Sequence, residues 1–169
     1  MTLIALICAI VVPNLGAFIP EARIQGSGNQ IIRTVDFLRS EARIQGKRMS
    51  MDFDLDHGLW RKVLPPEQRL TRDQDAATLE EQDDQWKPLE DDVKFGGAGD
   101  ARNFAEKGVY RLTFDEYGFS GDQMIVLKLV SDPNIVWTLT LQGLTGRMTV
   151  DESDKGQVPT LAAPTEGAF

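Results

Sequence analysis

Three aspartates at every second position, Asp52, Asp54 and Asp56, are the first candidates for chemistry in this sequence. Their spacing is typical of a calcium-binding EF-hand loop, which also needs glycine at its sixth position and glutamate at its twelfth. His57 and Val63 occupy those positions. We therefore reject the EF-hand interpretation and expect the three carboxylates on the solvated face of a strand, with His57 as a turn residue.

The sequence offers few residues for a catalytic or metal-binding site, because the chain has one histidine and one cysteine, Cys8. A lone thiol inside an apolar stretch is expected to pack as a small apolar side chain. Acid–base chemistry by a hydrolase would have to use neighbouring carboxylates, the candidates being Asp115 with Glu116, Asp83 with Asp84, and Asp91 with Asp92. Such pairs in polar loops are more often solvated than catalytic. We expect no enzyme activity, no cofactor, no metal and no small-molecule substrate.

Three kinds of binding remain to be considered: nucleic acid, phosphate and calcium. The net charge of −8 argues against electrostatic binding of nucleic acid. The glycine-rich stretch 96–99 has no strand-loop-helix context and no following Lys-Ser/Thr, so we expect a flexible connector and no phosphate loop. The acidic segment 73–92 leaves open a calcium-stabilised head, which a melting temperature insensitive to chelator would exclude.

The element that must position everything else is the opening stretch 1–20, which has no charged residue before Glu21. Its apolar run to Pro13 would form a helix of about 18 Å. Continued through Ile19, that helix approaches the length that spans a membrane. We expect residues 1–20 to insert in a membrane or a filament core. The alternatives are a cleaved signal peptide, which would need a basic n-region, and a buried element of a soluble core.

Residues 21–47 predict an amphipathic helix that continues the first segment. Apolar residues recur at helical spacing and predict the stripe that packs on a sheet: Ile24, Ile31, Val35, Leu38 and Ala42. Gly26 and Gly28 predict a bend or a loosening, and Gly46 predicts the end of the helix.

Residues 48–150 have the pattern of an antiparallel β head. Alternating apolar residues from Met49 to Leu55 predict a strand, and a turn at His57-Gly58 leads to a second strand ending at Val63. A short edge strand is expected within 86–95, where a proline is allowed. Later strands, joined by turns, predict a meander over 109–114, 124–130, 135–141 and 147–150. Residues 151–169 are polar and predict a mobile tail.

In this order the pieces resemble the type IV pilin and pseudopilin architecture, an α+β fold in which a long N-terminal helix packs on an antiparallel β-sheet head. The stretch from Thr2 to Asn14 is similar to the pilin N-terminal segment. Residues 38–47 (LRSEARIQGK), 114–121 (FDEYGFSG) and 144–150 (LTGRMTV) resemble the GspH/FimT family. The resemblance covers about residues 1–150.

One departure concerns the first residues. Family members carry a short basic leader, cut before an N-methylated aromatic residue that is followed shortly by a glutamate. Ala5 stands where that glutamate is expected, and Pro13 comes about two turns too early. We expect the true N-terminus to lie upstream of Met1, which a Gly-Phe-Thr-Leu-x-Glu-type stretch in the upstream coding region would show.

The resemblance implies a minor pseudopilin of the H type, a structural subunit of a type II secretion pseudopilus. It implies a single-pass protein of the bacterial inner membrane with a periplasmic head, whose partners are other pseudopilins and secretion-apparatus proteins. The filament-core and membrane contacts would come from Leu3, Ile4, Leu6, Ile7, Ile10, Val11 and Pro13.

The alternative within the resemblance is a FimT/FimU-like minor pilin of a type IV pilus, some of which bind DNA. DNA binding requires clustered cations that meet the phosphates. Here Arg147 is followed by Asp151, Glu152 and Asp154, and Lys155 is the only cation of the tail. We therefore expect no nucleic-acid partner.

Overall fold

The computed structural model describes the backbone of residues 2–63, 85–159 and 161, and the side chains of these ranges from Pro20 onward. The predicted contacts of residues 3–13 and the acid pair at 83–84 therefore lie outside the described side chains, as does most of the acidic segment 73–92.

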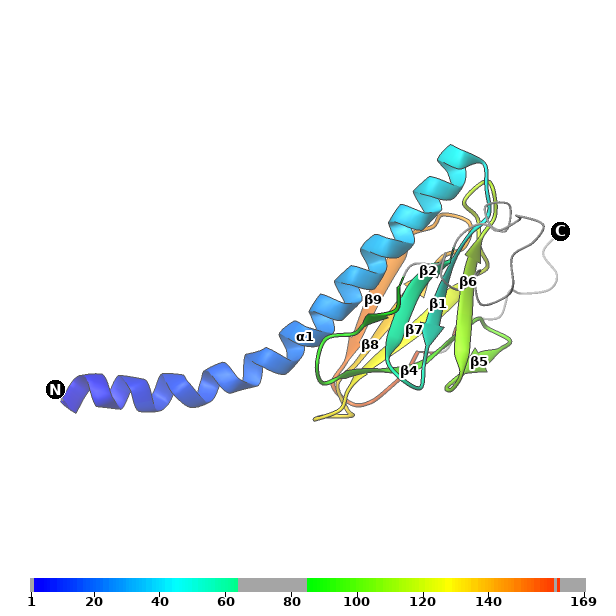
Figure 1. Ribbon diagram of the computed structural model, residues 1–169. Coiled ribbons are helices and arrows are strands. Elements are labelled where there is room, and N and C mark those ends of the chain that lie inside the picture. Colours follow the sequence, from blue (N-terminus) through cyan, green and yellow to red (C-terminus); the bar gives the residue numbers. More distant parts are fainter. Residues whose placement is uncertain (1, 64–84, 160, 162–169) are drawn as a thin grey trace.

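One helix, α1 (Thr2–Gln45), runs from the beginning of the chain to the head and projects well beyond it (Figure 1). It ends where Gly46 adopts a left-handed conformation, with φ of 59°. The amide of Lys47 then donates to the carbonyl of Ala42 at 3.1 Å, the closing bond of a Schellman cap. The helix is unbroken at Gly26 and Gly28, so of the expected bend or loosening the loosening is not found.

Within the part of the chain that the structure describes, the head contains two antiparallel sheets. In the first sheet the strands lie in the order β3 (Lys87–Pro88), β2 (Leu59–Val63), β1 (Met49–Asp54) and β6 (Val109–Phe114). In the second sheet the order is β5 (Phe104–Ala105), β4 (Val93–Gly99), β7 (Gln123–Leu129), β8 (Val136–Leu141) and β9 (Met148–Ser153). The α+β architecture, with the helix against antiparallel sheets, is confirmed.

The sheets differ from the predicted meander in one pairing. β7, β8 and β9 do follow one another, but β6 returns to β1, with Met51 opposite Leu112. Both of these side chains are buried in the main hydrophobic core. Local turn signals place successive strands in order, whereas this long-range pairing is decided by which apolar faces can share a core.

Two segments predicted as irregular belong to strands. Residues 96–99 form part of β4, with a bulge between Phe95 and Gly97, so the flexible-connector interpretation is wrong. At Gly99 a side chain would overlap the backbone of Asn103, so glycine allows β5 to pair closely there. β9 continues to Ser153, three residues beyond the predicted strand end.

The main core lies between α1 and the inner faces of both sheets. Phe53 of β1 and Phe95 of β4 meet edge to face with 5.7 Å between ring centroids, which joins the two sheets. A smaller cluster covers the outer face of the second sheet, where Leu161 packs on Met124, Val126 and Val136. This second cluster explains why β7 is buried on both faces.

Candidate functional site: the surface around the helix

The inner side of α1 is fixed on the head by an apolar stripe. Its members are Ile24, Ile31, Val35, Leu38 and Ala42, each no more than 3% exposed. Gly28 lies on the same side, where a Cβ would stand 3.1 Å from Cε3 of Trp137. The glycine therefore permits the helix to approach β8 closely, a role that the sequence pattern did not reveal.

A buried hydroxyl adds a polar tie beside this stripe. Ser27 is 1% exposed, and its Oγ accepts a hydrogen bond of 3.0 Å from the amide of Glu90, between β3 and β4. The helix is thereby connected to the edge of the first sheet as well as to its apolar face.

A groove with a volume of about 460 Å³ runs between α1 and the β2–β3 edge of the first sheet. It contains three cationic side chains, Arg33, Lys62 and Lys87, and none of the described residues that line it is acidic. Lys62 lies over the ring of Phe37, with 5.4 Å from Nζ to the ring centroid. We call this hollow the cationic groove, defined by Asn29, Gln30, Arg33, Phe37, Lys62 and Lys87.

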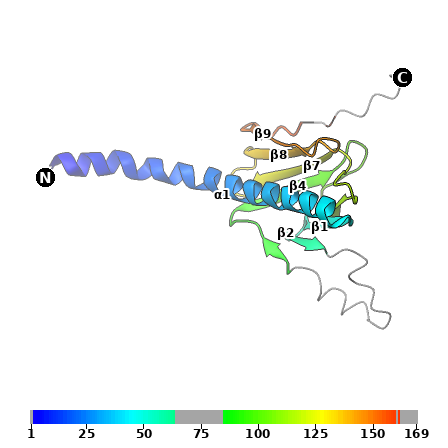
Figure 2. The same cartoon turned by 90° about the horizontal axis from the view of Figure 1, so that it is seen from above.

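A second groove, of about 450 Å³, lies on the other side of α1, against β8 and β9. Figure 2 shows these strands and the β1–β2 hairpin on opposite sides of the helix. Its charged lining is acidic, and none of the described residues that line it is a cation. We call it the acidic groove, defined by Glu21, Gln25, Trp137, Glu152 and Asp154.

The last turns of α1 are clamped by two loops. Nε of Arg39 donates to the carbonyl of Gly118 at 3.2 Å, and a Cβ at Gly118 would lie 2.6 Å from Cγ of Arg43. A Cβ at Gly146 would overlap the guanidinium of Arg39. Both glycines have positive φ. The segments 38–47, 114–121 and 144–150 thus meet in space at the end of α1.

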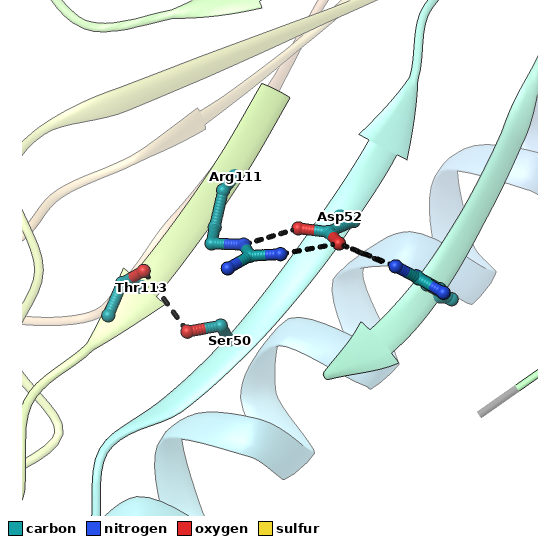
Figure 3. Close-up of polar contacts among 5 residues, drawn as sticks. Ser50, Asp52, Arg111 and Thr113 are labelled. Atoms are coloured by element: carbon teal, nitrogen blue, oxygen red, sulfur yellow. Dashed lines mark hydrogen bonds and ion pairs between the residues drawn. The ribbon is translucent and has the colours of Figure 1, made fainter. Parts of the chain in front are cut away.

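Asp52 lies on the outer face of the first sheet, yet it is buried, which corrects the expectation of a solvated carboxylate. Arg111 of β6 donates to it through two nitrogens, at 2.6 Å from Nε and 2.9 Å from Nη2 (Figure 3). Arg61 of β2 lies 3.4 Å away on the other side. The carboxylate therefore links three strands. Arginines at outward positions of both neighbouring strands were the sequence signal for this cluster.

His57 is exposed at the β1–β2 turn, as predicted. Its Nδ1 lies 2.8 Å from Oδ2 of Asp54. This hydrogen bond raises the pKa of His57 above 6.5, and the nearby negative charges act in the same direction. Desolvation acts to raise the pKa of Asp54, but the hydrogen bonds from His57 outweigh it and the pKa lies below 3.8.

Two of the candidate catalytic acids, Asp115 and Asp92, accept hydrogen bonds within or between loops. Oδ1 of Asp115 accepts hydrogen bonds from the amides of Tyr117 and Phe119. Asp92 accepts from the amide and the hydroxyl of Ser131. Among the residues that the structure describes, no group of three or more potential ligands could hold a metal ion. Within residues 20–45 of α1, the part of the helix whose side chains the structure describes, no stretch is both long and apolar enough to cross a membrane.

No protein-family model and no curated protein matches this sequence. Solved structures do match. The minor pseudopilin EpsH from the type 2 secretion system of Vibrio cholerae has a TM-score of 0.53 at 12% identity, over 77% of this chain and 97% of its own. The type IV minor pilin FimU of Pseudomonas aeruginosa has a TM-score of 0.52 at 14% identity, over 88% of this chain and 97% of its own. The predicted pilin-like fold is confirmed.

Proposed function

We propose that this chain is a structural subunit of a membrane-rooted filament, of the minor-pseudopilin kind that serves protein secretion. The observation that carries the proposal is the form of α1. The helix has 44 residues, or roughly 66 Å. The head contacts its second half, and its first half projects beyond the head (Figure 1).

The projecting half has the composition that such a role needs. Residues 2–20 carry no charge, so we propose that they lie in the inner membrane and, after assembly, in the core of the filament. There the contacts with lipid would be exchanged for contacts between helices. The contacting residues are proposed to be Leu3, Ile4, Leu6, Ile7, Ile10, Val11 and Pro13.

The head would then lie in the periplasm and contact neighbouring subunits or exported protein. A structural role agrees with the carboxylates described above, because Asp115 is engaged in a turn, Asp92 in a contact between two loops and Asp52 in a sheet contact. EpsH is a minor pseudopilin of a secretion system and FimU is a minor pilin of a type IV pilus, and both similarities support a filament subunit.

Deletion of this chain in its own organism tests the proposal. We expect a loss of exported protein in the culture medium that the wild-type chain restores, together with normal surface pili. Loss of pili with normal export would instead assign the chain to a type IV pilus. No change in either would contradict a filament role.

A matched pair of variants makes the complementation specific. Ile10→Asp places a charge in the proposed filament core, whereas Lys107→Asp changes an exposed residue of the head. We expect the first to fail in complementation and the second to succeed. Equal complementation by both would contradict the assignment of residues 2–20 to a membrane or filament core.

A further inference from the structure

Another pocket, with a volume of about 380 Å³, lies where the last turns of α1 meet the turn between β6 and β7. This volume falls within the range of small-ligand sites, about 300–1,000 Å³. We call it the arginine pocket, defined by Arg39, Arg43, Glu116, Tyr117 and Phe119. Its lining offers positive charge and aromatic surface to one and the same ligand.

Both arginines are held in place by the same glycine. Nε of Arg39 donates to the carbonyl of Gly118 at 3.2 Å. The stem of Arg43 lies beside Gly118, where a Cβ would stand 2.6 Å from its Cγ and 2.8 Å from its Cδ. Side chains that are already fixed lose less conformational freedom when a ligand binds. The two guanidinium groups are therefore arranged in advance for a partner.

No anionic side chain of the described residues fills that role. None of their carboxylates forms an ion pair with Arg39 or Arg43. Asp115, in the adjoining turn, accepts hydrogen bonds from the amides of Tyr117 and Phe119. Two guanidinium groups and the single carboxylate of Glu116 leave the lining of the pocket with one excess positive charge.

We propose that the arginine pocket binds a peptide carboxylate that stands next to an apolar side chain. The carboxylate would lie between the two guanidinium groups, whose planar forks of donors match its geometry. The apolar side chain would cover the rings of Tyr117 and Phe119, which are 66% and 44% exposed.

The charge of the pocket favours a carboxylate over a phosphate. A phosphate monoester carries a charge of about −1.5 to −2 at neutral pH, and Glu116 in the same pocket would repel it. Nucleic acid binds to cations that meet successive phosphates, whereas this pocket concentrates its two cations at one point of α1. The ligand class is therefore a peptide, whose carboxylate belongs either to its C-terminus or to an acidic side chain.

This inference does not depend on a filament role. The pocket lies at the end of α1 that is packed on the head, opposite the projecting half (Figure 1). A peptide would therefore bind there whether or not the projecting half is in a membrane.

NMR titration of the purified, isotope-labelled full-length chain in a non-ionic detergent tests the site. The probe is the dipeptide acetyl-Gly-Phe with a free C-terminal carboxylate. The same dipeptide with a C-terminal amide lacks only the carboxylate, and acetyl-Asp-Phe amide places the carboxylate on a side chain. We expect the free acid to shift the amide signal of Gly118, and the acetyl-Gly-Phe amide to bind about tenfold more weakly. A free acid that ends in glycine should also bind more weakly, because it lacks the apolar side chain.

Arg43→Gln is the sharpest variant, because glutamine keeps Cγ and Cδ beside Gly118 and removes only the guanidinium group. We expect it to weaken binding of the free acid about fivefold, and Arg43→Lys to restore part of the loss. Arg48→Gln makes the same change of charge at an exposed residue just beyond α1 and should bind like the wild-type chain. Circular dichroism first shows that each variant is folded. If Arg43→Gln is not, Tyr117→Ala at an exposed position replaces it and should weaken binding in the same direction.

Equal binding of acetyl-Asp-Phe amide and the free acid would assign the carboxylate to a side chain, and weaker binding would assign it to a chain end; either result supports the site. Four results would overturn the proposal: equal binding of the free acid and the acetyl-Gly-Phe amide, an equal effect of Arg43→Gln and Arg48→Gln, tighter binding of inorganic phosphate or a short DNA duplex than of the free acid, or no shift near Gly118. None of these bears on export or pili, so the deletion experiment and this titration fail independently.

Discussion

Asp52 shows how this sheet accommodates a buried charge. The carboxylate is 1% exposed, but the side chain of Arg111 that binds it is 51% exposed. The ion pair therefore keeps one partner in contact with water, which reduces the desolvation penalty that a fully buried pair would have. Because Arg61 contacts the same carboxylate from β2, the residue joins the central strand to both of its neighbours.

Replacing this carboxylate should cost more than replacing a neutral group beside it. We expect Asp52→Ala to lower the free energy of unfolding by about 1–3 kcal/mol, because two arginines lose a charged acceptor. Ser50→Ala removes only a hydroxyl contact with Thr113, at 3.1 Å on the same face, and should cost about 1 kcal/mol or less.

Urea unfolding of the full-length chain in detergent, followed by tryptophan fluorescence, measures both changes. Equal destabilisation by the two substitutions would show that the arginines find other acceptors and that the three-strand connection contributes little.

His57 provides a single titration signal, because it is the only histidine. Its pKa is raised by Asp54, so the protonated form favours the folded state. The resulting stabilisation is complete below the unfolded-state pKa of about 6.5 and is lost as the pH rises through the folded-state value. We expect Asp54→Asn to lower the pKa of His57, as measured by NMR titration of its imidazole.

Asp56→Asn serves as the matched control for this titration. Asp56 acts on His57 only through a weaker long-range attraction, so its replacement should lower the pKa by less. A larger fall with Asp56→Asn than with Asp54→Asn would contradict the assigned hydrogen bond.

At the scale of elements, Gly26 and Gly28 in the described part of α1 have different surroundings. A Cβ at Gly26 would meet only Cγ of Glu90 at 3.7 Å, an ordinary contact. Gly26→Ala should therefore stabilise the chain by up to about 1 kcal/mol through helix propensity. Gly28 has the Trp137 ring at 3.1 Å, and Gly28→Val should destabilise by about 1–3 kcal/mol through overpacking against β8.

Thermal unfolding followed by circular dichroism measures the two substitutions, which should shift the melting temperature in opposite directions. A stabilising Gly28→Val would mean that the helix does not lie as close to β8 as described here.

The elements that could be predicted from sequence are those with a local period. The helix, the β1–β2 hairpin and β7 to β9 follow from apolar spacing and turn residues. The pairing of β6 with β1 depends on a shared core between distant segments, and the strand at 96–99 depends on close backbone approach at Gly99. Neither leaves a periodic signal. The burial of Asp52 was missed because the alternation of apolar and polar residues along a strand shows which face of the sheet a side chain lies on. It does not show which neighbouring side chains cover that face.

At the scale of the whole molecule, the chain separates two tasks. The second half of α1 belongs to the head, through the apolar stripe, the Ser27 hydroxyl and the loop clamp at Arg39. This attachment leaves the first half to project from the head (Figure 1). A helix held at one end and apolar at the other suits a subunit that is rooted in a membrane and assembled through its helix.

In-cell photo-crosslinking from the projecting half of α1 tests this account most directly. A photoreactive residue placed at Ile10 should crosslink to the apolar helices of other filament subunits in the membrane fraction, while the same residue at Lys107 should give little of this product. Crosslinks from Ile10 to no other subunit, or equal yields from both positions, would contradict the claim that the projecting helix builds a filament.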